Sequence, residues 1–365
     1  MSSRMRFVLK IIILAGMLLG MPLLGVTLAG IPILRYLEFP PQTHYVRHAP
    51  FSWVAFVIYS VGILAVFIPL IVRGVRSSRG TQHVARTSQP FPWWGWMALV
   101  TGLASWVLAW SRFAWFAGLQ PHTFSPLWFS FIVVINAMDY RRSGRCLMTE
   151  RPVFFLLLFP SSAAFWWCFE YLNRFVQNWY YLGPDFSPLE YFWYATLPFS
   201  TVLPAVLSTR QVLLSTRFIQ RGYTNFKPVN TAHLRPAAAA TLAVAAAGLA
   251  GIGVWPNYLF PLLWVSPLLI IVALQALMNE QTIIDQMGTG DWRVATASVL
   301  AALICGMFWE MWNYFSLAKW EYSIPFVHRY QIFEMPILGY AGYLPFGLEC
   351  TVVGGLVSQL LRSAD

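Results

Sequence analysis

The sequence predicts an all-α polytopic membrane protein with about ten transmembrane helices. Of the 365 residues, 58% are hydrophobic and only 10% are charged. The apolar residues are also gathered into stretches of membrane-spanning length, roughly 17 to 25 residues. These stretches cover residues 8–34, 51–72, 92–110, 123–139, 153–172, 191–208, 236–254, 258–278, 294–315 and 336–361.

The first stretch begins like a secretory signal peptide, because Arg4, Arg6 and Lys10 precede or enter an apolar run. The run is longer than a signal peptide needs, and no small-x-small cleavage site is followed by a polar segment. We therefore expect this stretch to remain in the membrane as an anchor.

Basic residues set the expected orientation. The formal net charge is +10, and most of the 24 Lys and Arg residues fall on one side of a ten-span arrangement. The positive-inside rule then places both termini in the cytoplasm of a multi-pass plasma (bacterial inner) membrane protein. Because the charge is spread over several loops, we attribute it to orientation and to attraction for anionic lipid at the cytoplasmic face rather than to nucleic-acid binding.

No motif in the chain predicts a metal or another cofactor. The His44-x3-His48 spacing can hold a metal on a helix, but Pro40 and Pro41 just before it disfavour one. We find no nucleotide-binding or serine-hydrolase motif. The cysteines form no C-x-x-C pair, so we interpret them as small apolar residues without disulfides; they are Cys146, Cys168, Cys305 and Cys350.

One motif occurs twice, each time at the end of an apolar stretch. The first copy is FWWCFEYLNRFVQNWYY and the second is GMFWEMWNYFSLAKWEY. Both contain Glu-x-x-Asn followed by Trp-x-Tyr, and the copies lie about 140 residues apart. An acid inside a membrane is costly and marks a functional site by default. The shared residues are Glu170, Asn173, Trp179 and Tyr181 in the first copy and Glu310, Asn313, Trp320 and Tyr322 in the second.

Further matches in the same order predict a tandem duplication. Pro121-x4-Pro126 corresponds to Pro256-x4-Pro261. We expect two N-terminal helices followed by two four-helix repeats in the same orientation. The expected divisions are 1–91 (two helices and a cytoplasmic linker), 92–208 (first repeat), 209–235 (a basic cytoplasmic linker, either a surface helix or a solvated loop) and 236–365 (second repeat).

Glu170 and Glu310 are the candidate catalytic acids. Removal from water disfavours a charged carboxyl, so each acid can keep its proton, and the Asn three residues later shares its helix face and can orient it. Aromatic rings nearby can stabilise a cation. The candidate catalytic residues are Glu170, Glu310, Asn173, Asn313, Glu190 and Glu334, and the candidate substrate-binding residues are Trp167, Trp179, Tyr181, Trp309, Trp320 and Tyr322.

Each candidate has a structural alternative. Glu-x-x-Asn can be a polar clasp between helices. Glu190 and Glu334 can act as bases, or they can pair with basic residues at the surface. The glycines of the last stretch suit close helix packing, which we favour, or leave room for a ligand; they are Gly339, Gly342, Gly347, Gly354 and Gly355.

The stretch from Asp139 to Leu207 resembles the integral-membrane lycopene cyclase domain, the type made as two short subunits or fused to a phytoene synthase. The resemblance rests on Asp139-Tyr-Arg-Arg, on Phe169-Glu170-x-x-Asn173 and on Pro188-Leu189-Glu190. Where that family has paired glutamates, this chain has Glu190-Tyr191, and its units have four spans rather than three. The resemblance implies carboxylate proton donors and a need for two units.

We therefore expect an enzyme that acts on a long isoprenoid or carotenoid by acid-initiated cyclisation, isomerisation or hydration, without a cofactor. Two other classes stay open: a transporter or lipid-handling protein, and a structural membrane protein whose Glu and Asn residues only lock helices. A transporter should depend on a proton gradient, whereas a cyclase should work in detergent.

Overall fold

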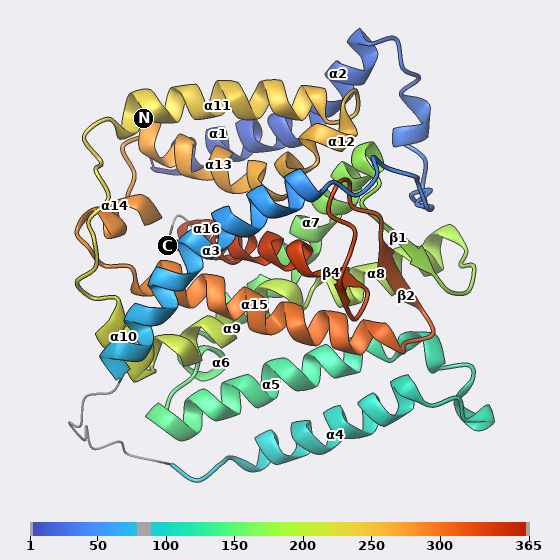
Figure 1. Ribbon diagram of the computed structural model, residues 1–365. Helices are drawn as coiled ribbons and strands as arrows, with labels where there is room; N and C mark the ends of the chain where they lie inside the picture. Colours follow the sequence, from blue (N-terminus) through green and yellow to red (C-terminus); the bar gives the residue numbers. More distant parts are fainter. Residues whose placement is uncertain (1–2, 79–88, 363–365) are drawn as a thin grey trace.

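Long helices run roughly side by side through the computed structural model, and short strands lie near one end of them (Figure 1). The structure describes residues 3–78 and 89–362. The prediction of an all-α protein is confirmed. The longer helices are α1 (Ser3–Ala15), α2 (Met21–Leu28), α3 (Trp53–Ser78), α4 (Trp93–Trp110), α5 (Phe124–Ser143), α7 (Pro152–Val176), α8 (Pro188–Phe199), α9 (Val202–Leu214), α11 (Leu234–Gly251), α13 (Pro261–Leu277), α15 (Arg293–Tyr314) and α16 (Tyr343–Arg362).

Short elements connect these helices. A π-helical turn over Gly16–Gly20 joins α1 to α2, and a 3-10 segment over Ile337–Gly342 leads into α16. The short helices are α6 (Leu147–Glu150), α10 (Arg217–Gly222), α12 (Pro256–Leu259) and α14 (Ile283–Gly288); the strands are β1 (Trp179–Leu182), β2 (Lys319–Tyr322), β3 (Gln331–Ile332) and β4 (Met335–Pro336).

Every predicted apolar stretch overlaps a helix of the structure. In the described part of the chain, seven helices are long and apolar enough to cross a membrane, which characterises a multi-pass membrane protein. The apolar helix α13 is shorter than these, and α4 and α5 are helical without belonging to the seven. The seven are Arg4–Leu28, Trp53–Ser77, Pro152–Val176, Pro188–Leu214, Leu234–Gly251, Arg293–Tyr314 and Ile337–Arg362.

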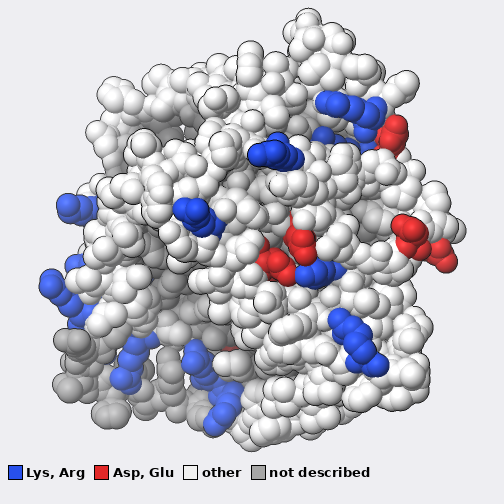
Figure 2. Space-filling model, turned by 45° about the vertical axis from the view of Figure 1, so that its right-hand side comes forward, with Lys and Arg blue, Asp and Glu red and all other residues white. Residues whose placement is uncertain are grey.

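The outer helices present apolar side chains rather than charges. None of the apolar window of α3 is buried inside the protein, and large apolar residues of α3 and α4 such as Val54 and Trp93 are exposed. Figure 2 shows wide areas of one face with neither acidic nor basic side chains. Such a surface suits contact with lipid tails.

The predicted stretch 191–208 is not one straight helix. It is divided into α8 and α9 near Ser200, where Pro198 and Pro204 each lack a backbone N–H. The buried hydroxyl of Ser162 on α7 compensates for the break: it donates to Phe199 O at 2.6 Å and accepts from Leu203 N at 3.0 Å. Helix α9 then continues to Leu214, past the expected domain boundary at residue 208.

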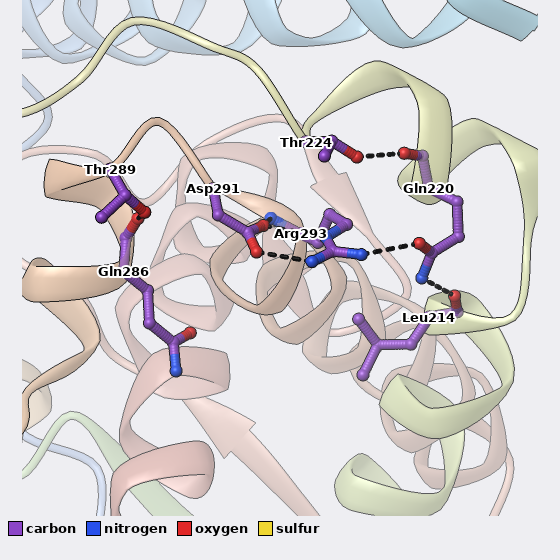
Figure 3. Close-up of polar contacts among 7 residues, drawn as sticks. All are labelled: Leu214, Gln220, Thr224, Gln286, Thr289, Asp291 and Arg293. Carbon is purple, nitrogen blue, oxygen red and sulfur yellow. Dashed lines mark hydrogen bonds and ion pairs between the residues drawn. The ribbon is translucent and has the colours of Figure 1, made fainter.

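Part of the expected linker 209–235 packs on the protein. In the short helix α10, Ile219 is fully buried, and Tyr223 just after it donates its hydroxyl proton to Leu70 O of α3 at 2.6 Å. Figure 3 shows how this region is held to the start of α15: Arg293 donates to both oxygens of Asp291 and, at 2.8 Å, to Gln220. Residues 79–88 of the other expected linker lie outside the described residues.

Helices α7, α9, α13 and α15 surround α16 and contact it. Close approach requires small residues here: a Cβ at Gly347 would lie 2.1 Å from Ser298 O of α15. The start of α1 and the end of α16 lie at the left of Figure 1, and β1 and β2 lie at the right.

Candidate functional site

The two copies of the repeated motif meet in one antiparallel strand pair. Strand β1 comes from the first copy and β2 from the second. The pairing is symmetric, because the Trp of each copy pairs with the Tyr of the other. At the centre of the pair Tyr180 faces Glu321, and its hydroxyl donates to the carboxylate at 2.6 Å. The pairs are Trp179 with Tyr322, Tyr180 with Glu321, Tyr181 with Trp320, and Leu182 with Lys319.

The two asparagines hold these strands to the helices before them. Asn173 Nδ2 donates to Trp179 O at 2.8 Å, and Asn313 Nδ2 donates to Trp320 O at 2.7 Å. In return, Asn313 Oδ1 accepts from Trp320 N at 2.8 Å, and Asn173 Oδ1 accepts from Asn178 N at 2.8 Å. Both side-chain amides are therefore used by strand backbone, and neither bonds the glutamate three residues before it.

Glu170 is fully buried on α7, where one of its oxygens accepts three bonds. Trp166 Nε1 donates to Oε1 at 3.2 Å, Trp179 Nε1 donates at 3.1 Å, and the Tyr181 hydroxyl donates to the same oxygen. The other oxygen, Oε2, is buried without a hydrogen-bond partner. The tryptophan and the tyrosine of the Trp-x-Tyr sequence thus both serve the acid.

Glu310 repeats this arrangement on α15. It is also fully buried. Its Oε1 accepts from Tyr322 at 2.7 Å and from Tyr343 at 2.7 Å, and its Oε2 has no partner. Trp320 Nε1 bonds the Tyr322 hydroxyl at 2.8 Å instead of the acid. Each acid therefore has one oxygen held by a tyrosine of its own strand and one oxygen free of hydrogen bonds.

A cavity of about 670 Å³ joins the two copies. The sequence-predicted residues Trp179, Tyr181, Trp309, Trp320 and Tyr322 all line it. Trp166, Trp264 and Tyr343 add to its aromatic wall, and the chain between α2 and α3 contributes Gln42 and Thr43. A cavity of this size and character suits a largely apolar ligand.

The two glutamates are not themselves part of the cavity wall; they lie directly behind it. The tyrosines that donate to them, Tyr181 and Tyr322, do line the cavity. Burial, followed by the nearby carboxyl, raises the pKa of both tyrosines well above the ordinary value. Their hydroxyls therefore stay protonated and available as donors over the physiological pH range.

Trp167 and Glu190 lie away from this cavity wall. Trp167 Nε1 donates to Thr196 Oγ1 at 3.0 Å, and its ring stacks on Phe192 of α8. Glu190 is exposed and accepts from Ser187 N at 2.9 Å, which closes a capping box at the start of α8. Both residues therefore support α8 in this structure.

Glu334 belongs to a charged group beside β2. Lys319 Nζ contacts Glu334 Oε1 at 2.6 Å and Glu321 Oε1 at 3.1 Å. This is the surface pairing that the sequence left open as an alternative. Because Lys319 lines the cavity and Glu334 does not, the lysine is the member of the group that a ligand can reach.

The glycines of the last predicted stretch, 336–361, divide between the two expected roles. Gly347 and Gly354 give close packing, since a Cβ at Gly354 would lie 2.6 Å from Leu207. A Cβ at Gly342 would meet no atom within 4 Å, and this residue lines the cavity. Gly342 therefore leaves room for a ligand.

The sequence did not single out Tyr343, which donates to Glu310. Trp166, which donates to Glu170, was expected among the aromatic residues around that acid but not among the substrate-binding residues. Trp166 lies four residues before its acid, so helical spacing was a usable signal. Tyr343 follows Glu310 by 33 residues, and no local pattern connects such positions.

Within the described residues, no three metal-ligating side chains gather into a possible metal site. Both ring nitrogens of His48 are already engaged, with Asn257 Oδ1 at 2.9 Å and Gln177 O at 3.1 Å. Comparison with known proteins gives no match, whether to family models, to curated proteins or to solved structures.

Proposed function

We propose that this protein is a membrane enzyme that protonates a long isoprenoid or carotenoid and so starts its cyclisation, isomerisation or hydration. The observation that carries the proposal is that two buried acids, one from each motif copy, are hydrogen-bonded to tyrosines that line the same apolar, aromatic cavity. The resemblance to integral-membrane lycopene cyclase domains favours the same substrate class.

The proton reaches the substrate through a tyrosine. In this step the hydroxyl of Tyr181 or Tyr322 turns from its glutamate toward the cavity and gives its proton to a double bond. The protonated carboxyl of Glu170 or Glu310 then acts as donor and returns a proton to the phenol oxygen. The resulting carbocation closes a ring or shifts its double bond and then loses a proton, which restores the acid. In a hydration, water adds to the cation instead and releases the proton.

The cavity wall supports a cationic intermediate. Trp166, Trp179, Trp309 and Trp320 line it from both motif copies. Indole faces attract cations by about 0.5 to 2 kcal/mol each, and more strongly away from water.

The proposal includes the architecture expected from the sequence: about ten membrane crossings, two N-terminal helices and two tandem four-helix repeats. The exchange symmetry of the β1–β2 pairing supports a duplication. We place the protein in a bacterial inner membrane, with both termini in the cytoplasm and the strand pair on the opposite side, as the distribution of basic residues favours.

Pigment analysis in a lycopene-producing bacterial host tests the proposal. Wild type should yield a new cyclic, isomerised or hydrated product by chromatography and mass spectrometry, and Glu170→Gln with Glu310→Gln should abolish it at equal membrane levels. Tyr181→Phe with Tyr322→Phe should lower the yield at least tenfold. Tyr314→Phe, a change at a tyrosine that is not bonded to either acid, should not. Unchanged pigments in cells that express the wild-type protein would exclude carotenoids as substrates.

A structural role has specific support for the asparagines. Asn173 and Asn313 give both halves of their amides to strand backbone, as a clasp does. We therefore propose catalytic roles for the glutamates and strand-holding roles for the asparagines. A protein with only clasps should function normally with Glu310→Gln.

A further inference from the structure

A second cavity, of about 210 Å³, lies toward the far end of α16 from the aromatic one. It is lined by α16 at Thr351 and Ser358, by α9 at Arg210 and by the start of α7 at Arg151. Thr351 and Ser358 are 8 and 15 residues beyond Tyr343, or roughly 12 and 22 Å along the helix at 1.5 Å per residue. The cavity is therefore separate from the proposed catalytic site and has no part in it.

Its two arginines carry charge without a counter-ion. Arg210 donates to Thr351 Oγ1 at 3.1 Å, while its Nε atom is buried and has no hydrogen-bond partner. Arg151 donates to Ser358 Oγ at 3.2 Å and lies over the Phe154 ring, 4.2 Å from its centroid. Each guanidinium repels the other. In the described part of the chain, neither is paired with a carboxylate within 4.0 Å.

The half-buried Arg210 thus keeps its Nε atom out of contact with water and without a hydrogen-bond partner, which is unfavourable for a charged group. Glu150 is the one acid in the cavity wall, and its carboxylate is engaged with Arg145 at 3.2 Å. The two guanidinium groups, the Ser358 hydroxyl and the amide of Gln211 form instead a set of donors for an anion with several acceptor oxygens. The Thr351 hydroxyl, which donates to Ser298 Oγ at 2.6 Å, orients Arg210. Arginine forks match phosphate oxygens in this way.

The cavity also has space for such a group. Its volume corresponds to that of about seven water molecules in the liquid, at roughly 30 Å³ each. Gly355 faces it, and a Cβ added there would meet no atom within 4 Å. A larger residue at this position would therefore fill the cavity rather than disturb helix packing.

We propose that the cavity between Arg151, Arg210, Thr351 and Ser358 is a binding site for a phosphate group, carried by a lipid headgroup or by a small soluble phosphate. This differs from general attraction of anionic lipid to exposed basic loops, because Arg210 is sequestered between α9 and α16 and is already oriented by Thr351.

Ligand-dependent thermal unfolding of the purified full-length protein in neutral detergent tests the site. The probes are inorganic phosphate, didecanoyl phosphatidic acid, didecanoyl phosphatidylcholine and acetate. A bound ligand raises the melting temperature with its concentration. We expect phosphatidic acid to do so. Stabilisation by inorganic phosphate as well would show that a soluble phosphate is accepted; its absence would assign the site to a lipid headgroup.

Three variants locate the effect. Arg210→Gln, Gly355→Leu and Arg151→Gln should each weaken the apparent affinity for the phosphate probe at least tenfold. Because Arg151 is exposed, Arg151→Gln keeps the test available if the other two variants fail to fold. Arg141→Gln removes an exposed basic residue outside the cavity and should leave affinity unchanged. The proposal is overturned if no phosphate probe stabilises wild type, if acetate or phosphatidylcholine acts equally, or if the cavity variants bind like wild type.

Discussion

Asn173 and Asn313 show how one residue type does the same structural task in both motif copies. Each amide satisfies a buried carbonyl and a buried N–H at the start of its strand. Replacement by leucine leaves these groups unpaired, at about 1 to 3 kcal/mol each. The neighbouring glutamates keep their own donors, so the two side chains of Glu-x-x-Asn have separate roles.

We predict that Asn173→Leu and Asn313→Leu each lower the melting temperature in detergent by several degrees, since two groups are left unpaired in each variant and about 1 kcal/mol shifts a protein of 365 residues by roughly 1 °C. Asn225→Leu, a change at an exposed residue, is the control. Melting temperatures equal to that of wild type would show that the two amides do not stabilise the fold.

Glu321 predicts an acid-sensitive contact at the centre of the strand pair. The Tyr180 hydroxyl, and then Lys319, hold the pKa of Glu321 below its ordinary value of 4.5. A carboxyl with a lowered folded-state pKa stabilises fully above the ordinary value, and this stabilisation is lost as pH falls through the lower value.

The melting temperature of wild type should therefore fall between pH 5 and pH 3 more steeply than that of Glu321→Gln, which has no carboxyl to protonate. Parallel pH profiles for the two proteins would contradict this role for Glu321. The comparison is a difference between two chains, so titration of other groups cancels.

At the scale of elements, the helices follow from sequence and the strands do not. Apolar stretches of sufficient length overlap every long helix, although α3 and α9 continue past their predicted ends and α16 begins later than predicted. The Trp-x-Tyr sequences were predicted to bind substrate, with no secondary structure assigned to them, and they lie in four-residue strands. A strand this short forms because it pairs with another strand. That partner lies 141 residues away in the sequence, so no local pattern predicts the pairing.

The break between α8 and α9 is a second feature that the sequence alone does not predict. Pro198 and Pro204 signal a disturbance, yet the carbonyl of Phe199 and the N–H of Leu203, which lie on the two sides of the break, are satisfied by Ser162 on another helix. The cavity wall follows the same principle: five of six predicted aromatic residues line it, whereas Trp167 on the same helix as Glu170 turns toward α8.

The contact of α2 with α11 predicts a position-specific effect. A Cβ at Gly25 would lie 1.7 Å from Ala250 O, so Gly25→Ala should force the helices apart at about 1 to 3 kcal/mol or more. A Cβ at Gly20 would meet no atom within 4 Å, so Gly20→Ala should be tolerated. Size-exclusion profiles and melting temperatures in detergent distinguish the two variants; equal behaviour would show that the helices do not touch there.

At the scale of the whole molecule, the arrangement predicts a definite orientation. The start of α1 and the end of α16 lie at one side and the strand pair at the other (Figure 1). With basic loops in the cytoplasm, a C-terminal green fluorescent protein fusion should fluoresce, and alkaline phosphatase fused after Pro184 should be active. The reverse pattern would invert the molecule and place the aromatic cavity toward the cytoplasm.

The central claim is that the paired acids protonate a substrate in one shared cavity. Solvent deuterium measures this step, because an acidic hydrogen exchanges with solvent before it is transferred to carbon. The purified protein is incubated with lycopene in detergent made with heavy water, and the product is analysed by mass spectrometry. Glu190→Gln, a change at the exposed helix cap, serves as the control for Glu170→Gln with Glu310→Gln.

We predict a product that carries one deuterium on carbon per protonation event with wild type and with Glu190→Gln, and no product with the double variant. A product formed without deuterium, or formed equally by the double variant, would contradict protonation by these acids.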